Sequence, residues 1–430
     1  MHNMDKISYD TVDEIVHKAM LPNGLTVYIV PKRNYSKTYG VFMTNYGSID
    51  RKFVPIGEKE PIVVPDGIAH FLEHKLFEKE TYDVFSTFLR QGASPNAFTS
   101  FTKTAYLFSA TENMTENVET LLDFVQDPYF SDESVEKEKG IIAQEIKMYN
   151  DLPDWQALMG TIRNMYEKHP VRIDIAGTVE SIGEITKEHL YTCYETFYHP
   201  ANMVLFVVGN VDPEQLYERI EQNQQAKSFP EKQTVKRYMP EEREKVYRSD
   251  VTIHLPVQVP KVAIGIKGKI REQHGEEMIR EECIQSILLD YFFAESGLYY
   301  EQLYAEGLID QSFSYSSTVE QSFQFALLQS NTNNVTSFQD RMQDLFQQIS
   351  DHAIEESLFL TMKRKQIGEY IRSFNSLEFI ANQYAQYQFH GIDLFKIPDI
   401  IASITLDEVE QYVKQWITND NVTVCKVMQE

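Results

Sequence analysis

Apolar residues recur along the chain with two periods, one typical of strands and one typical of helices. Strands are predicted in LTVYIV (25–30) and TYGVFMTNYGS (38–48), because β-branched and aromatic residues are concentrated there and turn residues lie between them. A helix is predicted in PDGIAHFLEHKLFEKE (65–80), a run of good helix formers in which Asp66 is the expected N-cap. The chain therefore begins as a mixture of strands and helices.

The rest of the first half continues this mixture. A turn is expected at 94–96, before a strand-like segment at 97–110. Helical periodicity dominates from 113 to 150, and a further helical region ends near Tyr198. The apolar run NMVLFVVGN (202–210) is predicted to be a buried strand that closes this half.

The second half repeats part of the first. The segment SIGEITKEHLYTCYETFYHPANMVLFVV matches IASITLDEVEQYVKQWITNDNVTVCKV at a constant offset, and each copy reads as a helix followed by a strand. Three pairs of identical residues illustrate the offset: Ile185 and Ile404, Thr186 and Thr405, Asn202 and Asn421. Two unrelated helix–strand units are the alternative, but an offset near half the chain length favours a duplication.

A highly charged stretch lies between the two halves. KSFPEKQTVKRYMPEEREKVYRSD (227–250) has two prolines and few apolar residues, which is typical of an interdomain linker. We therefore expect a first repeat at 1–226, the linker at 227–250 and a second repeat at 251–430. The fold class is predicted to be α+β, with each repeat a mostly antiparallel β-sheet flanked by helices.

Composition and charge narrow the classes of partner. The chain has 430 residues, enough for more than one core, and its 40 basic and 64 acidic residues give a net charge of −24. This field repels phosphate backbones and anionic membranes, so nucleic acid and membrane are not expected partners. The excess of acidic residues is typical of a well-solvated surface; the alternative is that it attracts cationic ligands into a cleft.

Localisation is predicted from what the sequence lacks. The first residues, MHNMDKISYD, show no signal-peptide pattern, and no apolar run approaches the ~20 residues of a membrane helix. Cys193, Cys283 and Cys425 lie far apart and form no paired motif, so we expect reduced thiols and a cytoplasmic protein.

The predicted helix at 65–80 carries a candidate metal site. His70 and His74 are four residues apart and therefore share one helical face, as two zinc ligands require. Glu73 lies beside that face, where it can hold a water molecule without ligating the ion. The order H-x-x-E-H is a metallopeptidase signature, whereas an amphipathic helix that happens to carry two histidines is the alternative.

A third ligand is needed, because catalytic zinc usually has three protein ligands and a water. The helical pattern in SDESVEKEKGIIAQEIKMYND (131–151) places Glu138 and Glu145 two turns apart on a stripe with apolar neighbours. A half-buried carboxylate there needs a partner, and a metal or a metal-bound histidine would be one. For either glutamate taken alone, a solvated side chain on a charged helix is the default interpretation.

Five segments resemble, in order, the pitrilysin/insulinase family of zinc metallopeptidases, and more closely its short bacterial members related to mitochondrial processing peptidase. They are HFLEH (70–74), GASPNAFTSFTKTAY (92–106), VEKEKGIIAQEI (135–146), HPVRIDIAGTVESI (169–182) and FYHPANMVLFVVGNV (197–211). The second half resembles the inert repeat of the family more loosely. The repeat offset carries the histidine motif to LDYFF (289–293), where ligand types are taken to be absent. A metal-free second repeat is therefore expected.

The resemblance implies specific roles for residues of the first repeat. His70, His74 and Glu145 would ligate one zinc ion per chain, Glu73 would be the general base, and Glu138 would be an acid that supports the site. An edge strand would bind an extended peptide through its backbone. The substrate-binding residues would be Ser94, Asn96, Ala97, Phe98 and Thr99.

The second repeat departs from the family pattern. Family members carry an arginine and a tyrosine there that contact substrate, but LYAEGLID (303–310) has Tyr304 and Asp310 at these places. Tyr315 is too far along to substitute. We therefore predict that the chain is the zinc-bearing subunit of a heterodimer with a metal-free homologue, with a homodimer as the alternative partner arrangement.

The overall prediction is a zinc endopeptidase that hydrolyses short or unfolded peptides inside a chamber, of which this chain forms half of a clam shell. A non-catalytic chamber or assembly subunit of the same fold is the alternative, but such a subunit has no need of the base Glu73. A structural zinc site is disfavoured, because such sites are usually closed by four protein ligands rich in cysteine and no cysteine lies near the helix.

Overall fold

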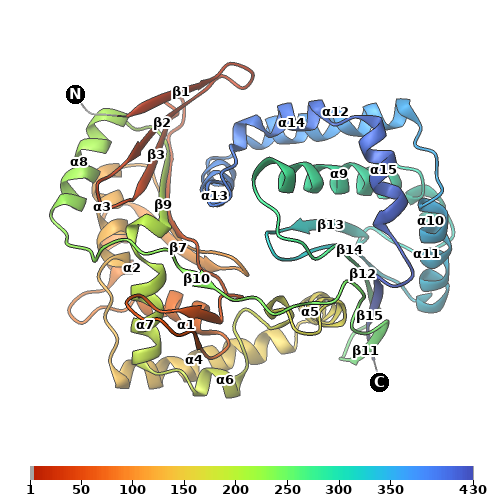
Figure 1. Ribbon diagram of the computed structural model, residues 1–430, viewed down its shortest axis with the longest axis horizontal. Coiled ribbons are helices and arrows are strands. Elements are labelled where there is room, and N and C mark those ends of the chain that lie inside the picture. The colour runs from red at the N-terminus through yellow and green to blue at the C-terminus, as the bar shows by residue number, and fades with distance from the viewer. Residues whose placement is uncertain (1–3, 430) are drawn as a thin grey trace. The chain divides into compact units, whose positions relative to one another are not determined.

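The computed structural model describes residues 4–429, which form two compact units (Figure 1). Unit 1 consists of the chain up to Ile146 together with residues 174–238 and 373–395. Unit 2 consists of residues 147–173 and 239–372 together with the chain from Lys396 onward. Neither unit is therefore one continuous stretch of chain.

Unit 1 is built on a sheet that is antiparallel except for one pair of strands, β3 and β9. Its strands, in spatial order, are β1 (Asp5–Tyr9), β2 (Glu14–Met20), β3 (Thr26–Pro31), β9 (Met203–Gly209), β4 (Thr38–Thr44), β8 (Thr104–Ala110) and β7 (Ala93–Thr99). A small separate sheet consists of β10 (Lys236–Arg237), β5 (Lys52–Val54) and β6 (Ile62–Val63). The predicted strand at 202–210 is confirmed as β9, which is buried along its whole length.

Helices cover the sheet of unit 1, and the apolar faces of all of them except α13 share one hydrophobic core with its strands. The helices are α1 (Ile68–Leu76), α2 (Val84–Arg90), α3 (Met114–Val125), α4 (Asp132–Asn150, from Lys147 in unit 2), α6 (Val179–Gly183), α7 (Lys187–Phe197), α8 (Pro213–Gln225) and α13 (Leu377–Gln388). Phe71 and Leu72 of α1 and Leu122 of α3 are fully buried in this core. The core thus fixes α1 against the sheet.

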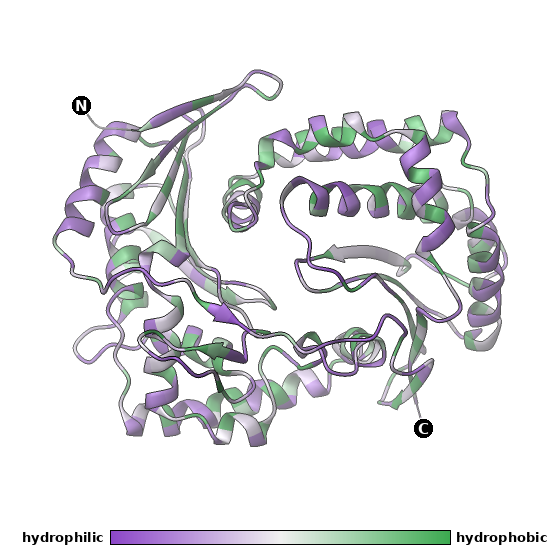
Figure 2. Ribbon diagram, viewed as in Figure 1, coloured by the Kyte–Doolittle hydropathy of each residue, from purple (hydrophilic) through white to green (hydrophobic). Residues whose placement is uncertain are grey.

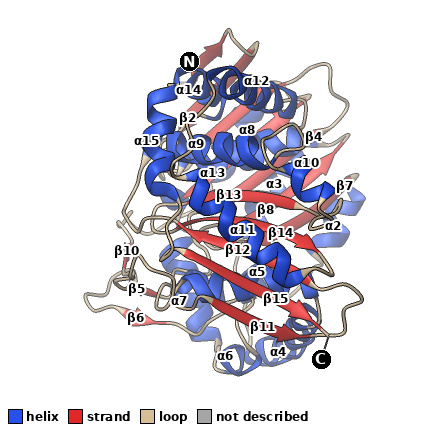
Figure 3. Ribbon diagram, turned by 90° about the vertical axis from the view of Figure 1, so that its right-hand side faces the viewer, coloured by secondary structure: helices blue, strands red, loops and turns tan. Residues whose placement is uncertain are grey.

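Unit 2 repeats the plan on a smaller sheet, whose strands run side by side in Figure 3. In spatial order the strands are β11 (Asp250–His254), β15 (Val422–Met428), β12 (Lys261–Lys267), β14 (Gln324–Asn331) and β13 (Ser314–Val319). The helices are α5 (Pro153–Met165), α9 (Gly275–Phe293), α10 (Tyr300–Ala305), α11 (Val335–Ile349), α12 (Glu356–Ser373, with Ser373 in unit 1), α14 (Ile397–Ser403) and α15 (Leu406–Trp416). Short 3₁₀ turns occur at Pro170–Arg172 in unit 2, at Pro200–Asn202 in unit 1, and at Leu394–Lys396, where the chain passes from unit 1 to unit 2. Hydrophilic and hydrophobic residues both occur along α9 and α12 (Figure 2), and every residue of α9 from Ile287 to Phe293 is buried.

The two sheets share one strand order, which confirms the predicted repeat at the level of the fold. The series β3-β9-β4-β8-β7 of unit 1 corresponds to β11-β15-β12-β14-β13 of unit 2, and the first pair of each series is parallel. The aligned residues Thr186 and Thr405 both form capping boxes, at the starts of α7 and α15. Asn202 donates to the Phe197 carbonyl at 2.7 Å, and Asn421 donates to the Trp416 carbonyl at 2.9 Å.

One helix from each half of the chain belongs to the sheet of the other half. Helix α5, which follows α4 in the first half, packs on β12 and β15 of unit 2. Helix α13, from the second half, packs on β4 and β9 of unit 1. The two halves of the chain therefore exchange helices when they form the compact units. The repeat boundaries at 227–250 remain a prediction.

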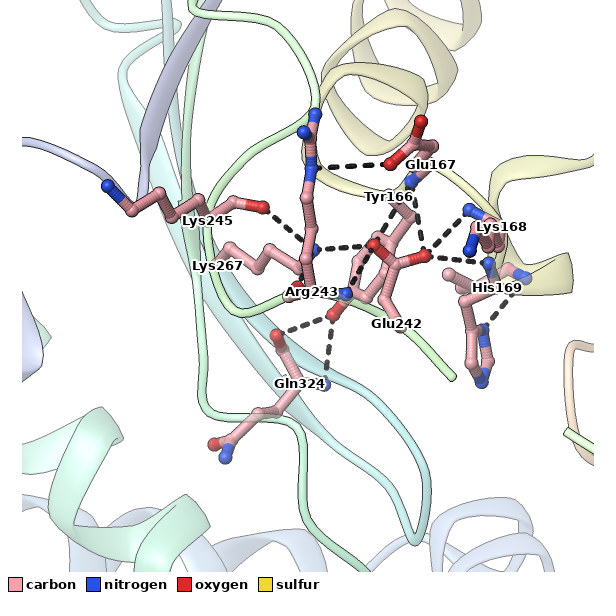
Figure 4. Close-up of polar contacts among 10 residues, drawn as sticks. Tyr166, Glu167, Lys168, His169, Glu242, Arg243, Lys245, Lys267 and Gln324 are labelled. Carbon is pink, nitrogen blue, oxygen red and sulfur yellow. Dashed lines mark hydrogen bonds and ion pairs between the residues drawn. The ribbon is translucent and has the colours of Figure 1, made fainter. Parts of the chain in front are cut away.

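The charged segment 227–250 is not uniformly exposed. Within unit 2, the carboxylate of Glu242 is fully buried and accepts hydrogen bonds from the backbone N–H groups of Lys168 (2.7 Å) and His169 (2.9 Å), as Figure 4 shows. The buried Lys267 ammonium lies 3.1 Å from the same carboxylate. These contacts attach the segment to the chain just beyond α5.

Two local predictions are wrong for physical reasons. Asp66 does not cap α1, which begins after Gly67; the Asp66 carboxylate pairs instead with Arg51. The expected turn at 94–96 lies inside β7, where Pro95 is tolerated because β7 is the edge strand and its missing N–H disrupts no inner ladder. The three cysteines are free and buried.

Candidate metal centre

Helix α1 presents the two histidines of the H-x-x-E-H motif on one face. The helix starts after Gly67, whose φ of 86° is a left-handed conformation, and a Cβ at this position would lie 2.3 Å from the Ala176 carbonyl oxygen. The side chains of His70 and His74 are 12% and 27% exposed, and their ring centres lie 4.6 Å apart. Both rings are therefore half sheltered on the same side of the helix.

Glu145 of α4 reaches the same point. Its Oε1 lies 3.6 Å from Nε2 of His70, and its Oε2 lies 3.6 Å from Nε2 of His74. Ligand atoms of the three residues all lie within 4.8 Å of one another. Zinc–ligand bonds of about 2.0–2.1 Å in a tetrahedron require ligand atoms roughly 3.3 Å apart, so the three side chains need only small adjustments to hold an ion.

Glu138 fixes the orientation of the second histidine. Its Oε1 lies 3.0 Å from Nδ1 of His74, which favours the tautomer with the proton on Nδ1 and leaves the Nε2 lone pair toward Glu145. Burial acts to lower the pKa of His74, but the hydrogen bond to Glu138 and the charges of Glu73, Glu138 and Glu145 raise it overall. A carboxylate–histidine pair of this kind raises the basicity of a metal ligand.

His70 is in a different environment. Burial, and then the neighbouring His74, lower the pKa of His70 to about 3, so its imidazole is neutral, as a metal ligand must be. Its Nδ1 is buried and has no hydrogen-bond partner among the described residues. The two histidines are thus a pair in which one ring is oriented by a carboxylate and the other by packing.

Glu73 lies between the histidines and the edge strand. It is only 8% exposed, and its Oε2 accepts a hydrogen bond of 2.7 Å from the Thr99 hydroxyl. Burial raises the pKa of Glu73 and the charge of Glu145 adds to this, while the Thr99 hydrogen bond and His74 lower it. A carboxylate with a raised pKa beside a candidate metal ion is suited to accept and return a proton.

The predicted substrate-binding residues lie on β7, at the free edge of the sheet. Ser94 and Asn96 are exposed and alternate with Ala97, which packs against the core, and with Thr99 on the same face as Ala97. Phe98 is half-buried. The strand therefore divides the five residues between two faces.

Unit 2 has an ion pair where the repeat offset places the metal motif. The expectation that segment 289–293 holds no ligand type is wrong, because Asp290 lies there on α9. Asp290 accepts from the Lys365 ammonium of α12 at 2.8 Å and from the Tyr315 hydroxyl of β13 at 2.7 Å. Tyr304 is 52% exposed, and Asp310 accepts hydrogen bonds from Ser312. Neither occupies this cluster.

The fold and the histidine motif together define the class of insulinase-like metallopeptidases. Residues 63–179 match the model of Insulinase (Peptidase family M16), and residues 184–365 match that of the Peptidase M16 inactive domain. The chain belongs to peptidase family M16. The family suggested by the sequence resemblance is therefore confirmed.

Relatives cover the whole chain. It is 48% identical over 422 residues to the uncharacterized zinc protease YmfH of Bacillus subtilis, with 98% of each chain aligned. The crystal structure of an M16-like protein from Alicyclobacillus acidocaldarius has 38% identity and a TM-score of 0.93, covering 100% of this chain and 99% of that one. A Helicobacter pylori protease with 18% identity and a TM-score of 0.82, aligned over 96% of this chain and 99% of its own, shares the fold.

The residues that the structure describes include no helix with the length and apolar character needed to cross a membrane.

Proposed function

We propose that the protein is a zinc-dependent endopeptidase of family M16 that hydrolyses short or unfolded peptides. The observation that carries the proposal is the convergence of His70, His74 and Glu145 beside the buried carboxylate of Glu73. Two imidazoles and one carboxylate suit zinc and leave a fourth position open, as in catalytic rather than structural sites. Relatives named zinc proteases support the assignment.

The residues of the site have complementary roles. His70, His74 and Glu145 would hold one zinc ion, which supplies a water of lowered pKa and polarises the scissile carbonyl. Glu73 takes the proton from the attacking water and returns it to the leaving amine. Glu138 keeps Nε2 of His74 unprotonated and correctly oriented.

The edge strand β7 provides the place for an extended peptide. One side of β7 pairs with β8, and its other side is the end of the sheet, where backbone groups would pair with a peptide strand. Pro95 has no N–H to offer, and the N–H of Ala97 donates to Oδ1 of Asn96 at 2.9 Å and would have to exchange that partner. Ser94 and Asn96 would face solvent beside the bound peptide. The acidic net charge makes a modest preference for basic peptides part of the proposal.

We also propose that a metal-free homologous subunit completes the site. Tyr304 and Asp310 stand where the resemblance leads us to expect the substrate-contacting arginine and tyrosine, and Tyr315 is engaged by Asp290. A non-catalytic chamber or assembly subunit is the second candidate function, favoured by the same missing pair. Three buried free thiols fit the proposed cytoplasmic location.

Metal analysis combined with peptide hydrolysis tests the proposal. The chain should bind one zinc ion and cleave peptides poorly when alone, and a co-expressed metal-free homologue should raise the rate. Glu73→Gln should abolish cleavage and retain zinc. An assembly subunit would be indifferent to Glu73→Gln, and robust cleavage by the isolated chain would exclude the need for a partner.

A further inference from the structure

A single hydrogen bond connects the edge strand of unit 1 to the proposed general base. The Thr99 hydroxyl of β7 donates to Oε2 of Glu73 on α1, at 2.7 Å. Hydrogen bonds between a hydroxyl and a carboxylate are short and charge-assisted, and this distance is typical of them. Because Glu73 is 8% exposed, water cannot freely replace the hydroxyl if it is removed.

The position of Thr99 in the sheet gives this bond its significance. Thr99 is the last residue of β7 and lies opposite Thr104 of β8. Its side chain shares a face with Ala97, which packs against the core on the side of β7 that α1 and α2 contact. Ser94 and Asn96 lie on the other face. Ala97 and Thr99 are therefore the members of the predicted substrate-binding set that turn inward, and Thr99 is the one whose hydroxyl reaches α1.

The chemistry of threonine suits a residue that fixes another side chain. Its β-branched side chain is stiff at χ1, so the hydroxyl has a defined direction once the strand backbone is placed. Holding Oε2 of Glu73 restricts the rotation of that carboxylate and leaves Oε1 as the oxygen that accepts the proton during hydrolysis. Pre-orientation of a catalytic group is a recognised source of rate enhancement.

We propose that Thr99 is a positioning residue that couples the backbone of the substrate-binding strand to the orientation of Glu73. This inference rests on the proposed peptidase function. A peptide that pairs with the free edge of β7 restrains the strand, and Thr99 passes that restraint to Glu73. The base is then best oriented when a substrate backbone lies alongside it.

Three substitutions test the inference. They are made in the zinc-loaded protein, which is assayed together with its metal-free partner where activity requires one. Thr99→Val removes the hydroxyl at nearly constant volume, Thr99→Ser retains it, and Thr111→Val changes an exposed threonine just beyond β8. We expect Thr99→Val to lower kcat roughly 10- to 100-fold, the effect of losing a hydrogen bond to a charged group. KM and the zinc dissociation constant, measured by chelator competition, should remain near their wild-type values.

The serine variant should recover most of the lost kcat, and Thr111→Val should match the wild type. If Thr99→Val keeps full kcat, or if its loss appears as weaker zinc binding or as a raised KM alone, Thr99 has no positioning role. If the wild-type protein with zinc and partner cleaves no peptide, the proposed function itself fails. An active wild type with an equally active Thr99→Val variant overturns the inference alone.

Discussion

Lys365 forms an ion pair with Asp290 in unit 2 at 2.8 Å. The two residues follow Glu145 and His70 of unit 1 by 220 positions, one more than the 219 that separate Thr186 from Thr405. In unit 1, α1 and α4 meet through His70 and Glu145; in unit 2, α9 and α12 meet through Asp290 and Lys365. The Lys365 ammonium thus joins α12 to α9 within unit 2. Unit 2 therefore needs no ion to join these helices.

Removal of that ammonium should destabilise unit 2. Lys365→Met leaves Asp290, whose side chain is 8% exposed, with the Tyr315 hydroxyl as its remaining partner in this cluster. We expect the free energy of unfolding to fall by about 1–2 kcal/mol, because Lys365 itself is one-third exposed. Urea unfolding with and without a chelator measures the effect. The exposed neighbour Glu369, 3.8 Å from Lys365, provides the control Glu369→Gln, which should change stability little. Equal effects of the two substitutions would contradict the prediction.

Glu138 should influence zinc affinity without touching the ion. Glu138→Gln weakens the acceptor that orients His74, and loss of such a partner typically lowers metal affinity 10- to 100-fold. The zinc dissociation constant of the metal-stripped protein measures this. Glu136 is two residues away on α4 but exposed, so Glu136→Gln is the matched control and should bind zinc as the wild type does. Unchanged affinity in Glu138→Gln would show that Glu138 has no supporting role.

The buried cluster at Glu242 predicts a loss of stability in acid, in two successive pH ranges. Burial lowers the pKa of His169 to about 4, so the unfolded state binds its proton first and stability falls as pH decreases from 6.5 toward 4. Burial acts to raise the pKa of Glu242, but the hydrogen bonds from the backbone of Lys168 and His169 and the contact with Lys267 lower that pKa to about 2. Its contribution is present above pH 4.5 and is lost as pH falls toward 2.

Unfolding free energies measured between pH 7 and pH 4 test the first of these ranges. His169→Gln should remove a slope on the order of 1 kcal/mol per pH unit, since one unit of pKa shift corresponds to about 1.4 kcal/mol. His254 is exposed on β11, and His254→Gln should leave the slope unchanged. The same pH slope in wild type and His169→Gln would contradict the assignment.

Gly140 in α4 should be replaceable with a gain in stability. It lies in the helix between Glu138 and Glu145, and a Cβ there would meet no atom within 4 Å. Gly140→Ala should stabilise the protein by about 0.5–1 kcal/mol, because glycine in a helix loses more conformational freedom on folding. Gly67→Ala should instead destabilise it, since Gly67 has a positive φ and contacts the Ala176 carbonyl. Thermal unfolding of both variants and of the wild type measures these changes in stability. A lower unfolding temperature for Gly140→Ala than for the wild type would contradict the prediction.

The sequence predicted the parts of the fold that depend on local pattern. The buried strand β9 and the helix around His70 follow from periodicity, and the equivalence of Thr186 with Thr405 follows from the internal repeat. The exchange of α5 and α13 between the two halves of the chain could not be predicted from the sequence, because a helical pattern does not say which sheet the helix covers. Asp66 misled as an N-cap because its partner Arg51 is distant in sequence from the helix.

The candidate site was only partly predictable, because only its features that lie on one helix follow from local pattern. The spacing of His70 and His74 is a property of one helix, and the resemblance added Glu145 from another. The bond from Thr99 to Glu73 and the pairing of Lys365 with Asp290 join residues on different elements. No spacing rule along the chain reveals such contacts.

The central claim is that His70, His74 and Glu145 bind one zinc ion. Titration of zinc into the metal-stripped protein tests it most directly, by giving the number of ions bound and their affinity. We expect one ion per chain in the wild type and no comparable binding in the double variant His70→Ala, His74→Ala. Zinc binding of unchanged stoichiometry and affinity in that variant, or none in the wild type, would contradict the claim.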